Sequence, residues 1–211
     1  MLQLANLSKA YAGRTVISVP DLTLSSGIHW FRGINGSGKT TLFRTVAGLL
    51  PFAGQVWLDQ QYEVTKTPVA YRMRVNYAEA EPLYPDFLSA RDLARFVGKA
   101  KQAPSGQTET LAGQLGMLDY WQQSVGTYSS GMLKKTALLL AFLGTPRVIL
   151  LDEPFTTIDD VAGAVLLNLI HEARQRDVLF LLASHQDISL AGLPITATWR
   201  VQEGMVIDGH S

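Results

Sequence analysis

One short segment has the residue types and spacing of a loop that binds phosphate groups. It places glycine first and sixth, then lysine and a hydroxyl residue: Gly33-Ile34-Asn35-Gly36-Ser37-Gly38-Lys39-Thr40. Glycines let consecutive backbone N–H groups face phosphate oxygens, and a helix that begins at Lys39 adds the positive end of its dipole. We expect Lys39 to reach the β- and γ-phosphates of ATP, Thr40 to bind Mg²⁺, and Thr41 to donate a further hydrogen bond to phosphate.

An accidental glycine-rich turn is the alternative interpretation of this segment. At average residue frequencies, a chain of this length matches the pattern by chance about one time in a hundred. The surroundings favour the phosphate loop, because an apolar strand is expected at 28–31 and a helix at 40–50, before Pro51 and Gly54.

Two adjacent acids, Asp152 and Glu153, follow the apolar segment 148–151. Open α/β sheets bind ligands at the carboxyl ends of their strands. Because neighbouring side chains on a strand point in opposite directions, we expect Asp152 to orient magnesium and Glu153 to polarise an attacking water. A solvated strand end before Pro154 is the alternative, and a phosphate loop in the same chain argues against it.

The elements that would position these residues alternate between strand and helix. Buried strands are expected at 28–31, 148–151 and 178–183, and helices at 130–143 and 159–176. This alternation predicts an α/β fold with a mainly parallel core sheet. Alternating apolar and polar residues in 2–24 predict an antiparallel β layer. The segments 198–201 and 205–207 predict a closing hairpin.

The segment from about 82 to 123 is helix-prone and is interrupted by a loop at 103–106. We interpret it, with the following helix, as an α-helical subdomain at about 82–145, inserted in the core. No repeat, low-complexity tract or linker divides the sequence, so we expect one domain over 1–211.

Composition excludes several classes of function. The 211 residues hold 18 basic and 18 acidic side chains and no cysteine, which excludes thiolate metal sites and cysteine nucleophiles. With no net charge we expect no nucleic-acid partner. The apolar stretches are too short to span a bilayer and the N-terminus lacks a signal sequence, so we expect a cytoplasmic protein.

The segment Tyr128-Ser129-Ser130-Gly131-Met132 shows that the sequence resembles the ATP-binding-cassette (ABC) ATPases, because it is similar to their signature loop. Ser129 can cap the following helix, and Ser130 and Gly131 bring N–H groups to an anion at that helix's N-terminus. The resemblance implies that this loop closes over ATP held by a second cassette, expected to be an identical chain. It also implies ATP hydrolysis that drives a separately encoded transmembrane permease, with the chain peripheral on the membrane's cytoplasmic face.

Further segments carry the same resemblance. The residues 156–159 are similar to the family's D-loop. His185, after Ser184, is similar to the family's switch histidine, which contacts the γ-phosphate. Tyr11 is similar to the aromatic residue that stacks on adenine. A core side chain is the alternative for Tyr11. The signature, with tyrosine first and methionine fifth, is similar to cassettes of export systems and favours an exporter.

The resemblance fails at one place. The family's glutamine between the strand near 75–77 and the helical subdomain is missing, and Ala80 stands there between Glu79 and Glu81. A neighbouring carboxylate is an oxygen ligand that suits Mg²⁺, so either acid can replace the glutamine, or the contact is absent. Three alternatives stay open: a cassette that acts away from membranes, a P-loop phosphotransferase, and a regulatory cassette that hydrolyses ATP poorly.

Overall fold

The computed structural model describes residues 1–185 and 192–209. Its described strands form one ten-stranded sheet in the order β5-β4-β1-β2-β10-β9-β3-β8-β7-β6. The strands are β1 (Leu2–Tyr11), β2 (Arg14–Leu24), β3 (Gly27–Arg32), β4 (Ala53–Leu58), β5 (Tyr62–Glu63), β6 (Val75–Ala78), β7 (Val148–Asp152), β8 (Leu179–Ser184), β9 (Ala197–Gln202) and β10 (Met205–Asp208). The helices are α1 (Lys39–Val46), α2 (Pro68–Arg72), α3 (Ala90–Ala100), α4 (Gln107–Gln114), α5 (Ser130–Ala141) and α6 (Asp160–Arg174), with a 3-10 turn η1 (Val125–Thr127).

The centre of the sheet is parallel. The strands β9, β3, β8, β7 and β6 run in one direction, and every residue of β7 and β8 is buried. Strands covered on both faces need continuous apolar sequence, which the two segments have. The strands β1, β2 and β4 pair antiparallel, as do β9 and β10. The predicted α/β fold with a mainly parallel core and an antiparallel layer is thereby confirmed.

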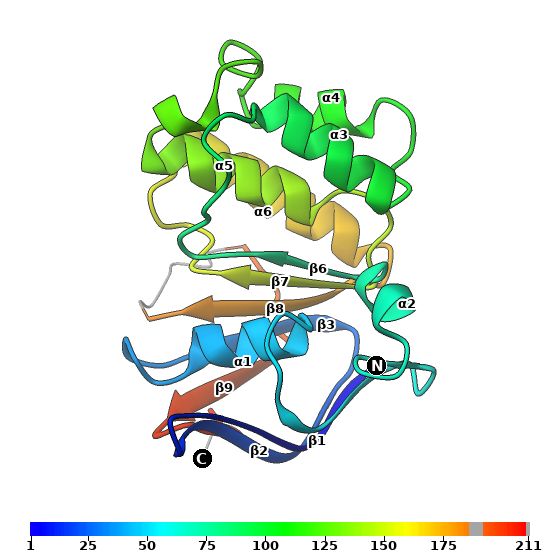
Figure 1. Ribbon diagram of the computed structural model, residues 1–211, viewed down its shortest axis with the longest axis vertical. Coiled ribbons are helices and arrows are strands. Elements are labelled where there is room, and N and C mark those ends of the chain that lie inside the picture. Colours follow the sequence, from blue (N-terminus) through cyan, green and yellow to red (C-terminus); the bar gives the residue numbers. More distant parts are fainter. Residues whose placement is uncertain (186–191, 210–211) are drawn as a thin grey trace.

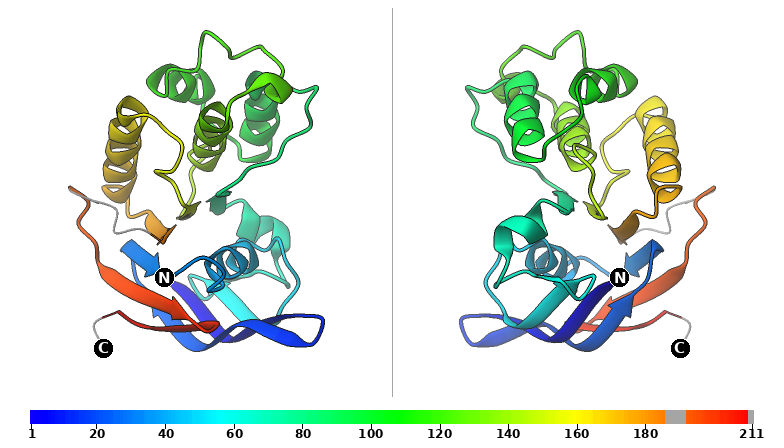
Figure 2. Two further views of the ribbon diagram at one scale, coloured as in Figure 1. Left: turned by 90° about the vertical axis from the view of Figure 1, so that its left-hand side faces the viewer. Right: turned by 90° about the vertical axis from the view of Figure 1, so that its right-hand side faces the viewer.

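Helices cover both faces of this sheet. The helices α3 to α6 lie over one face, and α1 and α2 lie on the other (Figure 1). The antiparallel strands curve around α1, so that this helix is enclosed between them and the parallel core (Figure 2). Two apolar clusters result, one under α3 to α6 and one around Leu42, Phe43 and Val46 of α1. The second cluster anchors the helix that follows the glycine-rich loop.

The helix α1 ends at Val46, earlier than the predicted 40–50. Gly48 follows with φ 73°, and its N–H donates to the carbonyl of Thr45 at 3.0 Å. A left-handed residue of this kind ends a helix by reversing the chain, and glycine adopts that conformation without steric cost. The prediction relied on Pro51 and Gly54 and missed the stop signal at Gly48.

The helices α3, α4 and α5 and the turn η1 lie in the segment predicted to be helical. Ser89 begins α3 with a reciprocal cap, in which its Oγ accepts from the N–H of Asp92 at 3.1 Å and its own N–H donates to the Asp92 carboxylate. The subdomain bounds 82–145 and the single domain 1–211 stay predictions. Among the described residues, no helix combines the length and hydropathy needed to cross a bilayer.

Candidate nucleotide site

The glycine-rich loop joins the end of β3 to the start of α1, as its spacing predicts. Gly38 has φ 110°, and a Cβ atom on it would lie 2.9 Å from the carbonyl oxygen of Val16. A Cβ atom on Gly33 would lie 2.4 Å from the carbonyl oxygen of Val201. The first and last glycines of the pattern are therefore required, one by conformation and both by the close approach of backbone.

Lys39 is held inside this loop. Its side chain is buried, and its Nζ donates to the carbonyl oxygens of Gly33 at 2.7 Å and Ile34 at 3.1 Å. Burial lowers the pKa of Lys39, while the charges of Glu153 and Asp152 act in the opposite direction. The loop thus combines a cation with the N-terminus of α1, which is the combination that phosphate groups need.

Asp152 stands at the end of β7, opposite the first turn of α1. Its Oδ2 accepts from the hydroxyl of Thr40 at 2.7 Å and from that of Tyr77 at 3.3 Å. Its Oδ1 is buried and has no hydrogen-bond partner among the described residues. Burial is the main reason that the pKa of Asp152 is raised. A hard divalent cation would satisfy Oδ1 and offset this desolvation, so Asp152 and Thr40 fit Mg²⁺.

Glu153 leaves the strand in a strained conformation. Its φ is 48°, which is uncommon for a residue with a side chain and is concentrated at functional sites. Its N–H donates to the carbonyl of Ala183 at 2.9 Å, and its Oε1 lies 2.9 Å from the N–H and 2.8 Å from Nδ1 of His185. Its Oε2 is buried without a hydrogen-bond partner among the described residues. Glu153, predicted to polarise the attacking water, and His185, predicted to contact the γ-phosphate, are therefore in direct contact.

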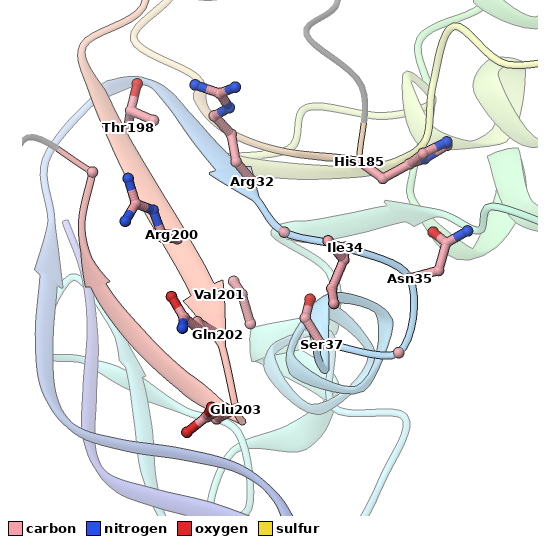
Figure 3. Close-up of a pocket in the computed structure, with 13 residues that line it drawn as sticks. Arg32, Ile34, Asn35, Ser37, His185, Thr198, Arg200, Val201, Gln202 and Glu203 are labelled. Atoms are coloured by element: carbon pink, nitrogen blue, oxygen red, sulfur yellow. The ribbon is translucent and has the colours of Figure 1, made fainter.

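Two cavities flank the glycine-rich loop. One, of about 640 Å³, lies between the loop and β9, with Ile34 and Ser37 on one side and Arg200 and Gln202 on the other (Figure 3). The second, of about 610 Å³, lies around the start of α1 and the end of β7. It is lined by residues of these elements and of nearby strands and loops: Val16, Asn35, Gly36, Gly38, Lys39, Thr40, Thr41, Ala80, Glu81, Asp152, Glu153, Thr156, Thr157 and His185. We assign the phosphates to the second cavity, because it unites the lysine with both acids.

The predicted signature loop lies in the helical layer. Ser129 is the N-cap of α5, and its Oγ accepts from the N–H of Met132 at 3.2 Å. Ser130 is exposed at the first turn, and a Cβ atom on Gly131 would lie 2.6 Å from the carbonyl oxygen of Thr157 in the predicted D-loop. Both helices α1 and α5 begin on the side to which β7 and β8 point (Figure 1).

The structure separates the two acids beside Ala80. Ala80 and Glu81 line the cavity that holds Lys39. Glu79 lies 3.4 Å from the guanidinium of Arg44 and lines another cavity. Of the two candidates for the missing glutamine, only Glu81 lies beside the proposed phosphate position.

Two residues of the site lie outside the predicted set, and one predicted residue lies apart from both cavities. Tyr77 and Lys134 were missed: Tyr77 donates to Asp152, and the Lys134 ammonium contacts the carbonyl of the same residue at 3.0 Å. No local spacing marks either one, because the contacts join segments far apart in the sequence. Tyr11 is 47% exposed, with the Lys9 ammonium 4.8 Å from its ring centroid, and it lines neither cavity beside the loop. Its contact with adenine stays a prediction.

Comparison with protein families identifies one match, described as "ABC transporter", over residues 20–156. The chain is 31% identical over 193 residues to human "Phospholipid-transporting ATPase ABCA7", covering 88% of this chain but only 9% of that protein. It is 30% identical over 203 residues to "Cytochrome c biogenesis ATP-binding export protein CcmA" of Albidiferax ferrireducens, covering 92% of this chain and 93% of the relative. It is 32% identical over 185 residues to "Aliphatic sulfonates import ATP-binding protein SsuB 2" of Burkholderia cenocepacia, covering 85% of this chain and 67% of that protein.

Solved structures share the fold. An ATP-binding subunit of an ABC transporter superposes with a TM-score of 0.88 at 22% identity, covering 98% of this chain and 88% of that one. The cassette MJ0796, in a dimer described as a post-hydrolysis state bound to ADP and Pi, superposes with a TM-score of 0.83 at 18% identity, covering 98% and 96%.

Proposed function

The chain belongs to the ABC transporter family and is an ABC-type ATPase, and from this premise we propose that two identical copies close head to tail over two MgATP molecules. Closure and reopening drive a separate transmembrane permease. In this arrangement each glycine-rich loop and Glu153 face Ser129, Ser130 and Gly131 of the other copy.

The position of the signature loop carries this proposal. The N-terminus of α5, capped by Ser129, is a second place where backbone N–H groups and a helix dipole favour an anion. None of the residues 129–131 is among those that line the cavity around Lys39 of the same chain. Because both helix N-termini lie at the end of the sheet to which β7 and β8 point (Figure 1), a second copy can bring its α5 to the phosphates.

The residues of the cavity divide the work of hydrolysis. Mg²⁺, when bound by Thr40 and Asp152, supplies positive charge to the phosphate oxygens. Lys39 adds a fixed cation, and Thr41 a hydrogen bond. Glu153 orients and polarises the attacking water through Oε2, while His185 holds Oε1 and keeps the carboxylate in position. Catalysis then consists of positioning and of charge stabilisation.

We further propose that Glu81 takes the place of the missing glutamine. Its neighbour Ala80 has no side-chain oxygen, whereas Glu81 has a carboxylate and lines the cavity with Thr40 and Asp152. Oxygen ligands and ligated waters suit Mg²⁺. Glu79, paired with Arg44, is directed elsewhere.

The surface next to the Ala80 loop has features of a binding site for a membrane partner. A cavity of about 300 Å³ lies between the ATPase core and the helical layer and is lined by Leu49, Leu83, Tyr84 and Val97 among others. Leu83 is 91% exposed, and Phe87, four residues later in the chain, is also exposed. Exposed apolar side chains around a hollow are typical of an interface, so we propose that 83–92 contacts the permease on the cytoplasmic face of the membrane.

We propose that the transport is export. The signature variant favours it, and the relative CcmA, which the chain matches over almost its full length, carries export in its description. The sulfonate relative is described as an import protein, so family membership alone fixes no direction.

Purification of the tagged chain from detergent-solubilised membranes of its own cell, with ATP present, tests the proposal. Mass spectrometry should then identify a polytopic membrane protein in stoichiometric amount. Recovery of soluble proteins or ribosomes alone would refute the transport function and leave the ATPase.

A further inference from the structure

Lys134 is a buried lysine whose ammonium joins three segments of the chain. It lies in the second turn of α5, five residues after the Ser129 cap, and is 1% exposed. Its Nζ donates to the carbonyl oxygens of Glu79 at 3.1 Å, Ala80 at 2.9 Å and Asp152 at 3.0 Å. An ammonium group has three hydrogens, so these three acceptors use its full donor capacity.

The acceptors belong to the two segments that line the cavity. Glu79 and Ala80 form the loop in which the glutamine is missing, and Asp152 ends the strand that leads to Glu153. Burial lowers the pKa of the Lys134 ammonium to about 8, while the nearby carboxylates of Asp152, Glu153 and Glu81 act in the opposite direction. A buried charge persists only where partners compensate its desolvation, and here the partners are parts of the site.

The neighbouring lysine provides a contrast. Lys135 pairs with the carboxylate of Asp159 at 2.7 Å, and that carboxylate is 55% exposed. The three hydrogen bonds of the Lys134 ammonium instead go to backbone carbonyls, so they fix the path of the backbone and do not depend on which side chains those residues carry.

On the basis of the proposed ATPase function, we propose that Lys134 is a positioning residue that ties the helix of the signature loop to the Ala80 loop and to the Asp152–Glu153 strand end. In this role it places Glu81 and Glu153 relative to the phosphates. It also transmits movement of the Ala80 loop to α5. Because the methyl side chain of Ala80 has no polar atom with which to bind nucleotide or Mg²⁺, the backbone tie substitutes for part of the connection that a glutamine would make.

Substitution of Lys134 separates this role from nucleotide binding. Lys134→Met removes all three donors and keeps an unbranched side chain, while the contacts of Lys39 are untouched. Small misplacement of catalytic groups reduces rates by up to about 100-fold, so we expect kcat to fall about 10- to 100-fold. The Kd for a fluorescent ATP analogue should change less than about threefold, because ground-state binding is retained.

The matched control is Lys99→Met, which removes an exposed lysine of α3. Thermal unfolding of each variant establishes that it is folded. If Lys134→Met does not fold, Lys134→Gln, which keeps two N–H donors, is measured by the same criteria. A folded Lys134 variant with kcat equal to that of Lys99→Met would overturn the proposal. Failure of both Lys134 variants to fold would also overturn it, because the residue would then serve only the stability of the core. Absence of ATP turnover in the unsubstituted chain would instead refute the proposed function.

Discussion

Replacement of Glu153 by glutamine removes the proposed base with little change of shape. The glutamine amide oxygen can still accept the hydrogen bond that the N–H of His185 now donates to Oε1 at 2.9 Å. The buried Oε2, which has no hydrogen-bond partner among the described residues, becomes an NH₂ group that cannot polarise water. The change therefore isolates the chemical role of a single atom.

The expected loss follows from the contribution of general-base catalysis. Such catalysis contributes about 10²- to 10⁴-fold, and each tenfold change corresponds to about 1.4 kcal/mol in the activation barrier. We expect Glu153→Gln to raise the barrier by about 3–5 kcal/mol and to leave ATP affinity nearly unchanged. The strained φ of 48° is present in both proteins, so the thermal midpoint should not shift by more than a few degrees.

Steady-state phosphate release and ATP binding, measured on the same preparations, test this expectation. Glu172→Gln is the matched control, since it makes the same chemical change on an exposed position of α6. A Glu153→Gln protein that releases phosphate at the rate of Glu172→Gln would refute the base assignment.

Three further substitutions address other parts of the site. Lys39→Ala should weaken ATP binding by at least about tenfold, because a buried charge-assisted contact to phosphate is lost, and calorimetry with MgATP would reveal it. Glu81→Ala should raise the Mg²⁺ concentration for half-maximal ATP binding by roughly tenfold, whereas Glu79→Ala should not; equal effects in a Mg²⁺ titration would remove Glu81 from the site. Gly131→Ala should lower the free energy of unfolding by about 1 kcal/mol. The new Cβ would crowd the Thr157 carbonyl at a cost of about 1–3 kcal/mol, while the higher helix propensity of alanine regains up to about 1 kcal/mol. A denaturant midpoint above that of the unsubstituted protein would contradict this geometry.

The parts of the site that are contiguous in sequence were predictable. The glycine-rich loop carries its own conformational requirements, and Asp152 and Glu153 follow a strand whose apolar run indicates burial on both faces. Residue types at fixed spacing therefore predicted the loop, and continuous apolar segments predicted the parallel core and the strand end. The same reasoning placed the end of α1 too late. It relied on Pro51 as the stop signal, whereas the left-handed conformation of Gly48 already ends the helix.

Contacts between distant segments were not predictable. Lys134 looks like an ordinary polar residue of a helix, and its role depends on carbonyls 18, 54 and 55 residues away. The choice between Glu79 and Glu81 likewise depends on Arg44 in α1, because Arg44 pairs with Glu79 outside the cavity that holds Lys39. A single sequence contains no local pattern for such tertiary contacts.

The molecular mass of Glu153→Gln in solution with MgATP tests most directly whether two copies close over nucleotide. We expect light scattering to detect a Glu153→Gln dimer at saturating MgATP and a monomer when nucleotide is removed. For Lys39→Ala we expect a monomer under both conditions. A Glu153→Gln protein that binds ATP and stays monomeric at every protein concentration would contradict the proposed dimer.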